Sequence, residues 1–328
     1  MKVSILVPVY GVEKYIEKCA ISLFEQTYKN IEYIFVDDCT PDSSIDILYT
    51  VIKRYPEREN NVHILHHKKN CGLAQARNSA LDVATGDFIL NVDSDDYLEL
   101  DAVEILCRTA YTEKADVVVF GSYIVFEKYR VAVPNQYNYT TKQAYIKSIL
   151  KKQASSCVWG KFISHKLYTD TKIKAIPGLN QGEDYAVIPR LLYYANHIVI
   201  LKDCLYNYTQ YNEQAYTKSF RKEHVQELLL ADKILSDFFE TKTDGDLYKE
   251  DLIVARLRTK TYMLKIAKHV IDIKEIAQIY SDNPRRYYSS LSFVDRLLLF
   301  LLHIKCYKLI LLITKAGFEL KKLMSIHK

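Results

Sequence analysis

The sequence predicts an α/β protein with a doubly wound, mostly parallel sheet and a helical C-terminal extension. Apolar, β-rich runs alternate with segments of helical period about five times over the first 120 residues, a pattern typical of parallel sheets with right-handed crossovers. Acidic residues follow two of the apolar runs. From about residue 223 onward only helical period remains. We therefore expect a catalytic domain over residues 1–220 and a helical region over residues 221–328.

The expected strands are the apolar, mostly β-branched runs, which lie at residues 2–9, 31–36, 62–65, 88–92 and 117–120. Helical period follows at residues 13–24, 73–84, 102–112 and 185–195. Another helix follows the second strand, and Thr40 and Pro41 predict its N-cap and its first helical position.

Composition narrows the class of protein. Hydrophobic residues make up 49% of the chain and charged residues 26%, which is ordinary for a globular protein. The net charge of +5 gives no overall basic field, so we expect no nucleic-acid partner. The seven scattered cysteines include no Cys-x-x-Cys pair, which favours a reducing compartment. The N-terminus lacks a signal-peptide pattern, and we expect a cytoplasmic protein.

The run at residues 88–92 ends in three carboxylates, Asp93, Asp95 and Asp96. Carboxylates are not expected in a dry core unless they are paired or bind metal, so the strand should deliver them to the ligand-binding edge of the sheet. On a continuing strand Asp93 and Asp95 would point to the same side. Such a pair suits Mg²⁺ or Mn²⁺ shared with substrate phosphates. An acidic turn that caps the next helix is the alternative.

The C-terminal segment is basic and apolar. From residue 285 to the end, nine Lys or Arg residues stand against two acids, a local charge of +7. The run at residues 297–313 is rich in Leu and Ile but contains two lysines, so it is a poor membrane span. Lysines recur every seven residues at Lys308, Lys315 and Lys322. A basic amphipathic helix on an anionic membrane surface and a helix packed on the core both fit this pattern.

Six motifs occur in an order that resembles the family 2 glycosyltransferases, which have the GT-A fold. They are VPVY at residues 7–10, VDD at 36–38, NCGLA with ARN at 70–78, ATGDFI at 84–89, DSDD at 93–96 and GED at 182–184. The resemblance is dense over residues 2–100, patchy to about 220 and absent after that. It implies an inverting transfer from a nucleoside-diphosphate sugar, most often a UDP-sugar, with a divalent cation.

The resemblance also implies roles for individual residues. It places seven residues at the donor nucleotide: Pro8, Tyr10, Asp37, Asp38, Arg77, Asp93 and Ser94. Asp95 would be the direct metal ligand, shared with Asp93, and Asp96 would support them. Arg77 would lie near the nucleotide or its diphosphate, although a surface position on a helix is the alternative.

Asp184 matches the family's general base, which would take the proton of the acceptor hydroxyl, and Glu183 would orient the acceptor. Plain capping of the following helix is the alternative for both. Trp159 would form an apolar platform under an acceptor sugar, or would belong to the core.

Two departures from the family pattern refine the expectation. The turn after the second acid pair is usually Gly-Ser-Thr-Asp, and here it begins with Cys39. The Gln-x-x-Arg-Trp motif of processive members is absent, so we expect one sugar per encounter. The acceptor would be a glycan or a polyprenyl-linked glycan of a bacterial surface polysaccharide, at the inner face of the membrane. A nucleotidyltransferase and a non-catalytic module that binds sugar nucleotides or a membrane are the alternative functions.

Overall fold

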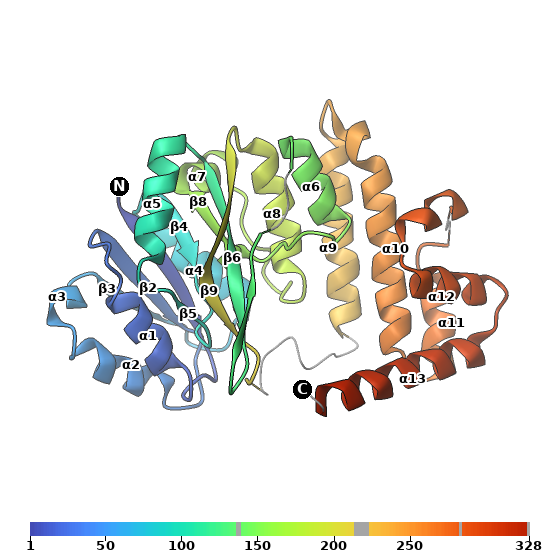
Figure 1. Cartoon of the computed structure of the whole chain (residues 1–328), viewed down its shortest axis with the longest axis horizontal. Helices are drawn as coiled ribbons and strands as arrows, with labels where there is room; N and C mark the ends of the chain where they lie inside the picture. Colours follow the sequence, from blue (N-terminus) through green and yellow to red (C-terminus); the bar gives the residue numbers. More distant parts are fainter. Residues whose placement is uncertain (136–138, 213–222, 282–283, 327–328) are drawn as a thin grey trace. The chain divides into compact units, whose positions relative to one another are not determined.

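The structure is a computed structural model that describes the chain except residues 136–138, 213–222, 282–283 and 327–328. Side chains are also not described at residues 223, 270 and 317–326. The chain forms two compact units, one of residues 1–146 and 154–227 and the other of residues 147–153 and 228–328 (Figure 1). The predicted boundary between residues 220 and 221 lies outside the described residues.

Strands and helices alternate through the first unit. Its elements are β1 (Val3–Val9), α1 (Ile16–Phe24), β2 (Ile31–Asp37), α2 (Ser44–Ile52), α3 (Pro56–Glu59), β3 (Val62–His66), α4 (Leu73–Val83), β4 (Phe88–Asn91), β5 (Tyr97–Leu98), α5 (Ala102–Glu113), β6 (Val117–Val125), β7 (Arg130–Val133), a 3₁₀ turn (Val158–Gly160), β8 (Lys161–Ser164), α7 (His165–Thr171), α8 (Glu183–Tyr194) and β9 (Ile198–Thr209). Helix α6 (Lys142–Leu150) continues from this unit into the second.

In the described residues the strands form one sheet in the order β3-β2-β1-β4-β8-β6-β9-β5, with β7 paired to β6. Strands β3, β2, β1 and β4 are mutually parallel, β8 runs antiparallel to β4 and β6, and β9 is parallel to β6. The predicted α/β fold class is confirmed.

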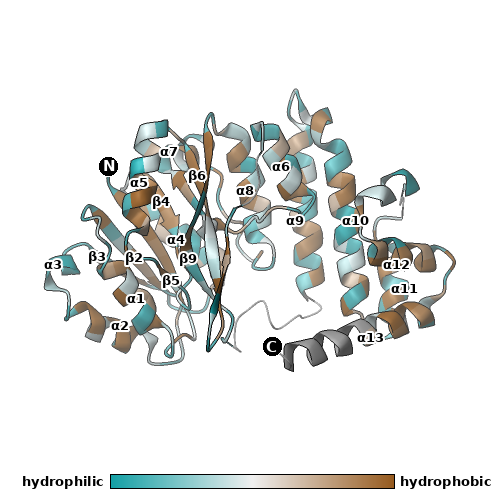
Figure 2. Ribbon diagram, in the orientation of Figure 1, coloured by the Kyte–Doolittle hydropathy of each residue, from teal (hydrophilic) through white to brown (hydrophobic). Residues whose placement is uncertain are grey.

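Helices cover both faces of the sheet. On one face, α1, α2 and α5 pack on a core that includes Ile5 of β1 and Phe35 of β2. On the other face, Leu6 and Ile89 line a small cavity together with residues of α4, α7 and α8. Figure 2 shows the strands coloured mainly as hydrophobic, as expected for a sheet buried on both sides.

The carboxyl ends of β1, β2 and β4 lie at one edge of the sheet because the three strands are parallel and in register, with Val9 opposite Asp37 and Leu6 opposite Asn91. The acids that follow β2 and β4 therefore emerge at this edge. Strand β4 ends at Asn91, so the expectation that Asp93 and Asp95 continue the strand is wrong.

The helix predicted to begin at Pro41 begins at Ser44 instead. The Asp42 carboxylate accepts hydrogen bonds from the Thr40 hydroxyl and from the Ser44 main chain, and this holds a longer loop before the helix. Cys39, at the position where the family has glycine, adopts a φ of 58°. This left-handed conformation explains why glycine is usual there.

The second unit is helical over its described residues. It contains α9 (Glu223–Glu240), α10 (Lys249–Ile266), α11 (Val270–Gln278), α12 (Phe293–His303), α13 (Tyr307–Ile326) and two 3₁₀ segments (Gly245–Tyr248 and Arg285–Ser290). The apolar run at residues 297–313, expected as one helix, is divided between α12 and α13. Lys305 in the intervening turn has a φ of 58°, which an α-helix does not permit.

Candidate active site

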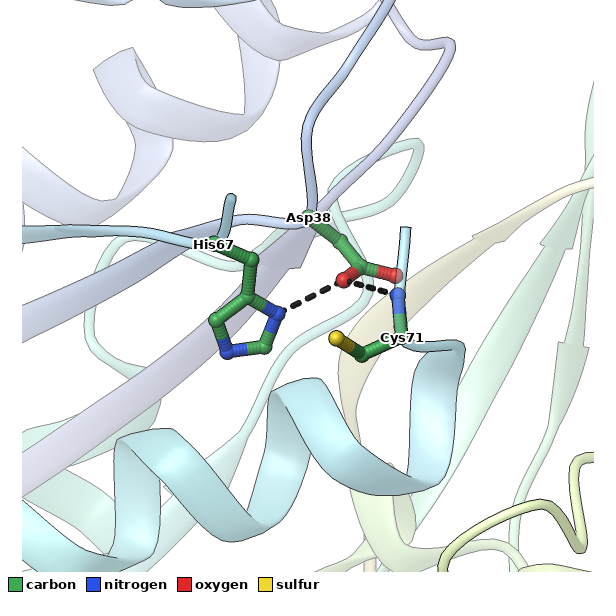
Figure 3. Close-up of side chains that lie close together, drawn as sticks. All are labelled: Asp38, His67 and Cys71. Carbon is green, nitrogen blue, oxygen red and sulfur yellow. Dashed lines mark hydrogen bonds and ion pairs between the residues drawn. The ribbon is translucent and has the colours of Figure 1, made fainter. Parts of the chain in front are cut away.

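The end of β2 holds a buried carboxylate. Asp38 accepts main-chain hydrogen bonds from Cys71 and Gly72, each at 2.8 Å, and its Oδ1 lies 2.6 Å from Nδ1 of His67. Figure 3 shows the Asp38 carboxylate between the His67 ring and the main chain of Cys71. Nε2 of His67 lies 2.9 Å from the Ser79 hydroxyl, which fixes the plane of the ring. Asp38 thus joins the end of β2 to the start of α4.

These side chains also have the chemistry of metal ligands. One ligand atom each from Asp38, His67 and Cys71 lies within 4.8 Å of the other two. The distance of 2.6 Å from His67 to Asp38 is nevertheless that of a hydrogen bond, and the carboxylate also accepts two amides. The contacts therefore explain the cluster without a metal.

Gly72, the N-cap of helix α4, has a φ of 87°, and a Cβ there would lie 2.7 Å from the Asn180 side chain. Glycine is needed for both reasons. Asn180 accepts a hydrogen bond from the Ala74 amide at 3.2 Å. The first turn of α4 is thereby tied to the segment that leads into α8.

Arg77 of α4 joins carboxylates from two distant segments. Its Nη1 donates to Glu183 at 2.6 Å and to Asp184 at 2.7 Å, and its Nη2 donates to Asp93 at 2.8 Å. The side chain is 8% exposed. Burial lowers the pKa of Arg77, but the three carboxylates raise it well above its ordinary value. The guanidinium stays charged and holds the start of α8 against the acids after β4.

Glu183 and Asp184 lie in the first turn of α8, but the Asp184 carboxylate faces the site and not its own helix. Its Oδ1 accepts from Arg77 and its Oδ2 from the Val158 amide at 3.0 Å. Burial raises the pKa of Glu183, with repulsion from Asp184 adding to the shift. Burial also raises the pKa of Asp184, opposed by Arg77. Asp184 thus makes contacts outside α8, which helix capping alone does not predict.

The loop after β4 is held by β9 and the residues that follow it. Asp96 accepts from the Tyr206 hydroxyl at 2.8 Å and from the Thr209 amide at 2.7 Å. The Asn212 side chain donates to Asp95 at 2.7 Å. Burial and then repulsion from neighbouring aspartates raise the pKa of both carboxyls, well above the ordinary value for Asp96.

Tyr206 also binds the main chain of this loop, because the Asp93 amide donates to its hydroxyl at 3.1 Å. Trp159 stacks on the Tyr206 ring with centroids 4.4 Å apart and an interplanar angle of 16°. It also stacks on Tyr208, at 5.5 Å. Trp159 is partly buried, so its ring supports the loop from the side of β9 and still has an exposed part.

The other residues of the expected nucleotide site surround the same sheet edge. Tyr10 follows β1 and is 50% exposed, which leaves its ring accessible, whereas Pro8 and Ser94 are buried. Asp37 accepts from the Thr40 amide at 2.8 Å and lies 2.9 Å from Nδ1 of His66.

The donor set at the acid loop fits a divalent cation. One guanidinium faces three carboxylates, and Asp95 and Asp96 add to the excess of negative charge. Asp93 accepts from Arg77 and Asp95 from Asn212, and both retain further lone pairs, because a carboxylate has about four acceptor sites. Both oxygens of Asp96 already accept protein donors. Asp93 and Asp95 are therefore the residues suited to hold Mg²⁺ or Mn²⁺.

The sequence did not single out several residues of this site, among them His67, Tyr206 and Asn212. His67 lies three positions before the NCG motif, which is its only signal. Tyr206 lies in a β-rich run, and every residue of such a run is expected to belong to the core. Asn212 has no local pattern.

A parallel α/β edge that gathers aspartates with shifted pKa values beside an Arg-bound Glu-Asp pair is the candidate active site of an enzyme. Comparison with known sequences identifies the family. The profile described as Glycosyl transferase family 2 matches residues 4–168, half of the chain. The chain belongs to this family and is a glycosyltransferase, as the motifs predicted.

Similar proteins come from several bacteria. The chain is 28% identical over 289 residues to Glycosyltransferase GlyG of Streptococcus pneumoniae, covering 84% of this chain and 90% of that protein. It is 36% identical over 102 residues to the putative teichuronic acid biosynthesis glycosyltransferase TuaG of Bacillus subtilis, covering 31% and 39%. The structure of S. aureus TarS 1–349 in complex with UDP-GlcNAc matches with a TM-score of 0.72 and 22% identity, covering 98% and 92%.

Proposed function

We propose that the protein transfers one sugar from a UDP-sugar to a hydroxyl of a glycan or polyprenyl-linked acceptor in the synthesis of a bacterial surface polysaccharide, with inversion at the anomeric carbon. The contact of Arg77 with Asp93, Glu183 and Asp184 supports this proposal most strongly. Through this contact the candidate base, Asp184, and a candidate cation ligand, Asp93, bind the same side chain. UDP-GlcNAc bound to TarS and the teichuronic acid role named for TuaG support the donor and the pathway.

The donor nucleotide would lie at the carboxyl edge of β1, β2 and β4. The exposed Tyr10 ring offers a face on which a base can stack. Asp38 is oriented by His67 and two amides, so it can accept a hydrogen bond from the base without losing its position. Asp93 and Asp95 would hold Mn²⁺ or Mg²⁺, which as a Lewis acid would stabilise the charge of the leaving diphosphate.

Asp184 would take the proton of the acceptor hydroxyl. A hydroxyl is a weak nucleophile, and a carboxylate within hydrogen-bond reach activates it. Arg77 and the Val158 amide fix both carboxylate oxygens, while burial raises the pKa of the group and makes it a stronger base. Glu183, on the same guanidinium, would orient the acceptor, and the exposed part of Trp159 would lie under its sugar ring. A single base opposite the leaving group gives one displacement, hence inversion.

A donor screen tests the proposal. The protein is incubated with Mn²⁺ or Mg²⁺ and a panel of UDP-, GDP-, CMP- and dTDP-sugars, and released nucleotide is measured. We expect cation-dependent release from a UDP-sugar and a rise in melting temperature with UDP and the cation together. Neither release nor stabilisation with any nucleotide would contradict the donor assignment. The anomeric configuration of the product, measured by NMR, tests inversion separately.

A further inference from the structure

Several apolar side chains of the second unit are exposed and lie outside its core. On α12, Phe293 is 72% exposed and Phe300 51% exposed, and Ile304 follows at the end of the helix with half of its side chain exposed. The spacing i, i+7 and i+11 places these three on one helix face, together with the partly buried Leu297. The opposite face of α12 is buried, as Leu298, Leu299, Leu301 and Leu302 show.

Helix α13, beyond the turn, also exposes apolar side chains. Leu309 and Leu312 are exposed, the latter at 65%, while Ile310 and Thr314 are buried. Figure 2 shows α12 and the first turns of α13 coloured largely as hydrophobic. We call the exposed side chains of both helices the α12–α13 surface. Scattered exposed apolar residues need no explanation, but aligned ones on adjoining helices mark an interaction site.

The charge of this surface has one sign. Arg296, Lys305, Lys308 and Lys315 are exposed among the apolar side chains. Over the described side chains from 293 to 316 the single carboxylate, Asp295, is buried and paired with Lys265. Lys308 and Lys315 are seven residues apart and flank Leu312 on the exposed side of α13. The third lysine of the predicted stripe, Lys322, has a side chain outside the described part.

We propose that the α12–α13 surface docks on an anionic lipid bilayer. Exposed phenylalanine and leucine beside lysine, without acids, are the composition of helices that lie in a membrane interface. The basic side chains complement anionic headgroups, and the apolar ones reach the acyl boundary. None of the described helices combines the length and the hydrophobicity that a membrane span needs. This inference does not depend on the proposed transfer reaction.

Vesicle sedimentation of the full chain tests the docking. One variant carries Phe293→Ser, Phe300→Ser and Leu312→Ser, and a second carries Lys305→Gln, Lys308→Gln and Lys315→Gln. A matched control carries Leu247→Ser and Ile271→Ser, two exposed apolar residues of the same unit outside this surface. Vesicles contain phosphatidylcholine alone or with phosphatidylglycerol. Circular dichroism and the melting temperature confirm that each variant folds.

We expect the wild type and the control to bind vesicles that contain phosphatidylglycerol, and to bind pure phosphatidylcholine much more weakly. The lysine variant should lose about a hundredfold in partition coefficient, because each basic residue near an anionic surface contributes about 1 kcal/mol. The apolar variant should lose a similar amount. Equal binding to both kinds of vesicle, no binding, or variants that bind like wild type would overturn the proposal. Self-association that the apolar variant abolishes would assign the surface to a second copy instead.

Discussion

Arg77 and Asp184 are 107 positions apart in the sequence, and their side chains lie 2.7 Å apart in the structure. The same guanidinium nitrogen binds Glu183, and the other terminal nitrogen binds Asp93. One side chain thereby connects the acids after β4 with the acids that open α8. The position of the candidate base relative to the candidate cation site depends on this contact.

Replacing Arg77 by alanine should lower the free energy of unfolding by about 3–5 kcal/mol, because three carboxylates lose the charge that compensates them. The loss should shrink as pH falls, since protonation of the carboxyls removes their repulsion. Urea unfolding at several pH values measures both effects. Arg54→Ala, which breaks an exposed pair with Glu17, is the control and should cost at most about 1 kcal/mol. If Arg77→Ala also lowered the free energy of unfolding by no more than about 1 kcal/mol, attraction between charges would not be what holds the cluster together.

Asp184→Asn should lower the turnover number about 10²- to 10⁴-fold, the usual contribution of a general base. The amide oxygen can accept from Arg77, while the NH2 group loses the bond to the Val158 amide, so folding and nucleotide binding should persist with a somewhat lower melting temperature. Released nucleotide and the melting temperature with UDP and cation separate the two effects. Asp170→Asn, at an exposed position on α7, is the control. Full turnover in Asp184→Asn would exclude this residue as the base.

Asp95→Asn should abolish the cation-dependent part of the stabilisation by UDP. Without cation the variant should melt no lower than the wild type, because the amide ends the repulsion from Asp93 that, with burial, raises the pKa of Asp95. For the wild type, stabilisation of about 2.7 kcal/mol is expected with ligand at 100 times Kd. Differential scanning fluorimetry with and without Mn²⁺ measures it. Asp203→Asn, an exposed acid, should behave as wild type. An unchanged cation response in Asp95→Asn would move the cation site elsewhere.

The strands were predictable because burial on both faces of the sheet imposes long apolar runs, as at residues 3–9 and 31–37. The start of α2 was not, since Pro41 suits a first helical position but the bonds of Asp42 extend the loop to Ser44. The division of the C-terminal run was not predictable either. Its apolar period continues through the turn at Lys305, and a left-handed lysine has no sequence signal.

Candidate site residues followed from motifs, but their contacts did not. The sequence suggested Arg77 and Asp184 separately, by resemblance, and contains no period that pairs residues 107 positions apart. Tyr206 was missed because a tyrosine in a buried strand is usually core, and only the fold shows its hydroxyl between the Asp93 amide and Asp96.

Tyr206→Phe tests this support of the acid loop. Removing the hydroxyl leaves a buried Asp96 oxygen and the Asp93 amide without this partner, which should cost about 1–3 kcal/mol of stability. It should also weaken cation-dependent nucleotide binding while sparing cation-independent binding. Tyr208→Phe keeps a ring beside Trp159 and serves as the comparison. If both variants bound the cation with equal affinity, the Tyr206 hydroxyl would have no role in cation binding and the residue would contribute only packing.

Glu32 of β2 should make the fold sensitive to acid. It is 3% exposed and accepts hydrogen bonds from the side chains of Lys2 and Ser4 and from Thr85. Burial raises its pKa, but these bonds outweigh burial and lower the pKa to about 2. A carboxyl whose pKa is lower in the folded than in the unfolded state stabilises the fold above the unfolded value, near 4.5, and this contribution is lost as pH falls toward 2.

The contribution of Glu32 to the free energy of unfolding at neutral pH should be about 3 kcal/mol, from 1.36 kcal/mol per pKa unit. Urea unfolding of Glu32→Gln should therefore give lower stability at pH 7 and a weaker dependence on pH between about 4.5 and 2. Glu104→Gln, at an exposed position on α5, provides the control, and its stability should follow that of the wild type at each pH. Parallel stability curves for Glu32→Gln and the wild type across this range would show that another group sets the acid limit, because a neutral amide at position 32 cannot titrate.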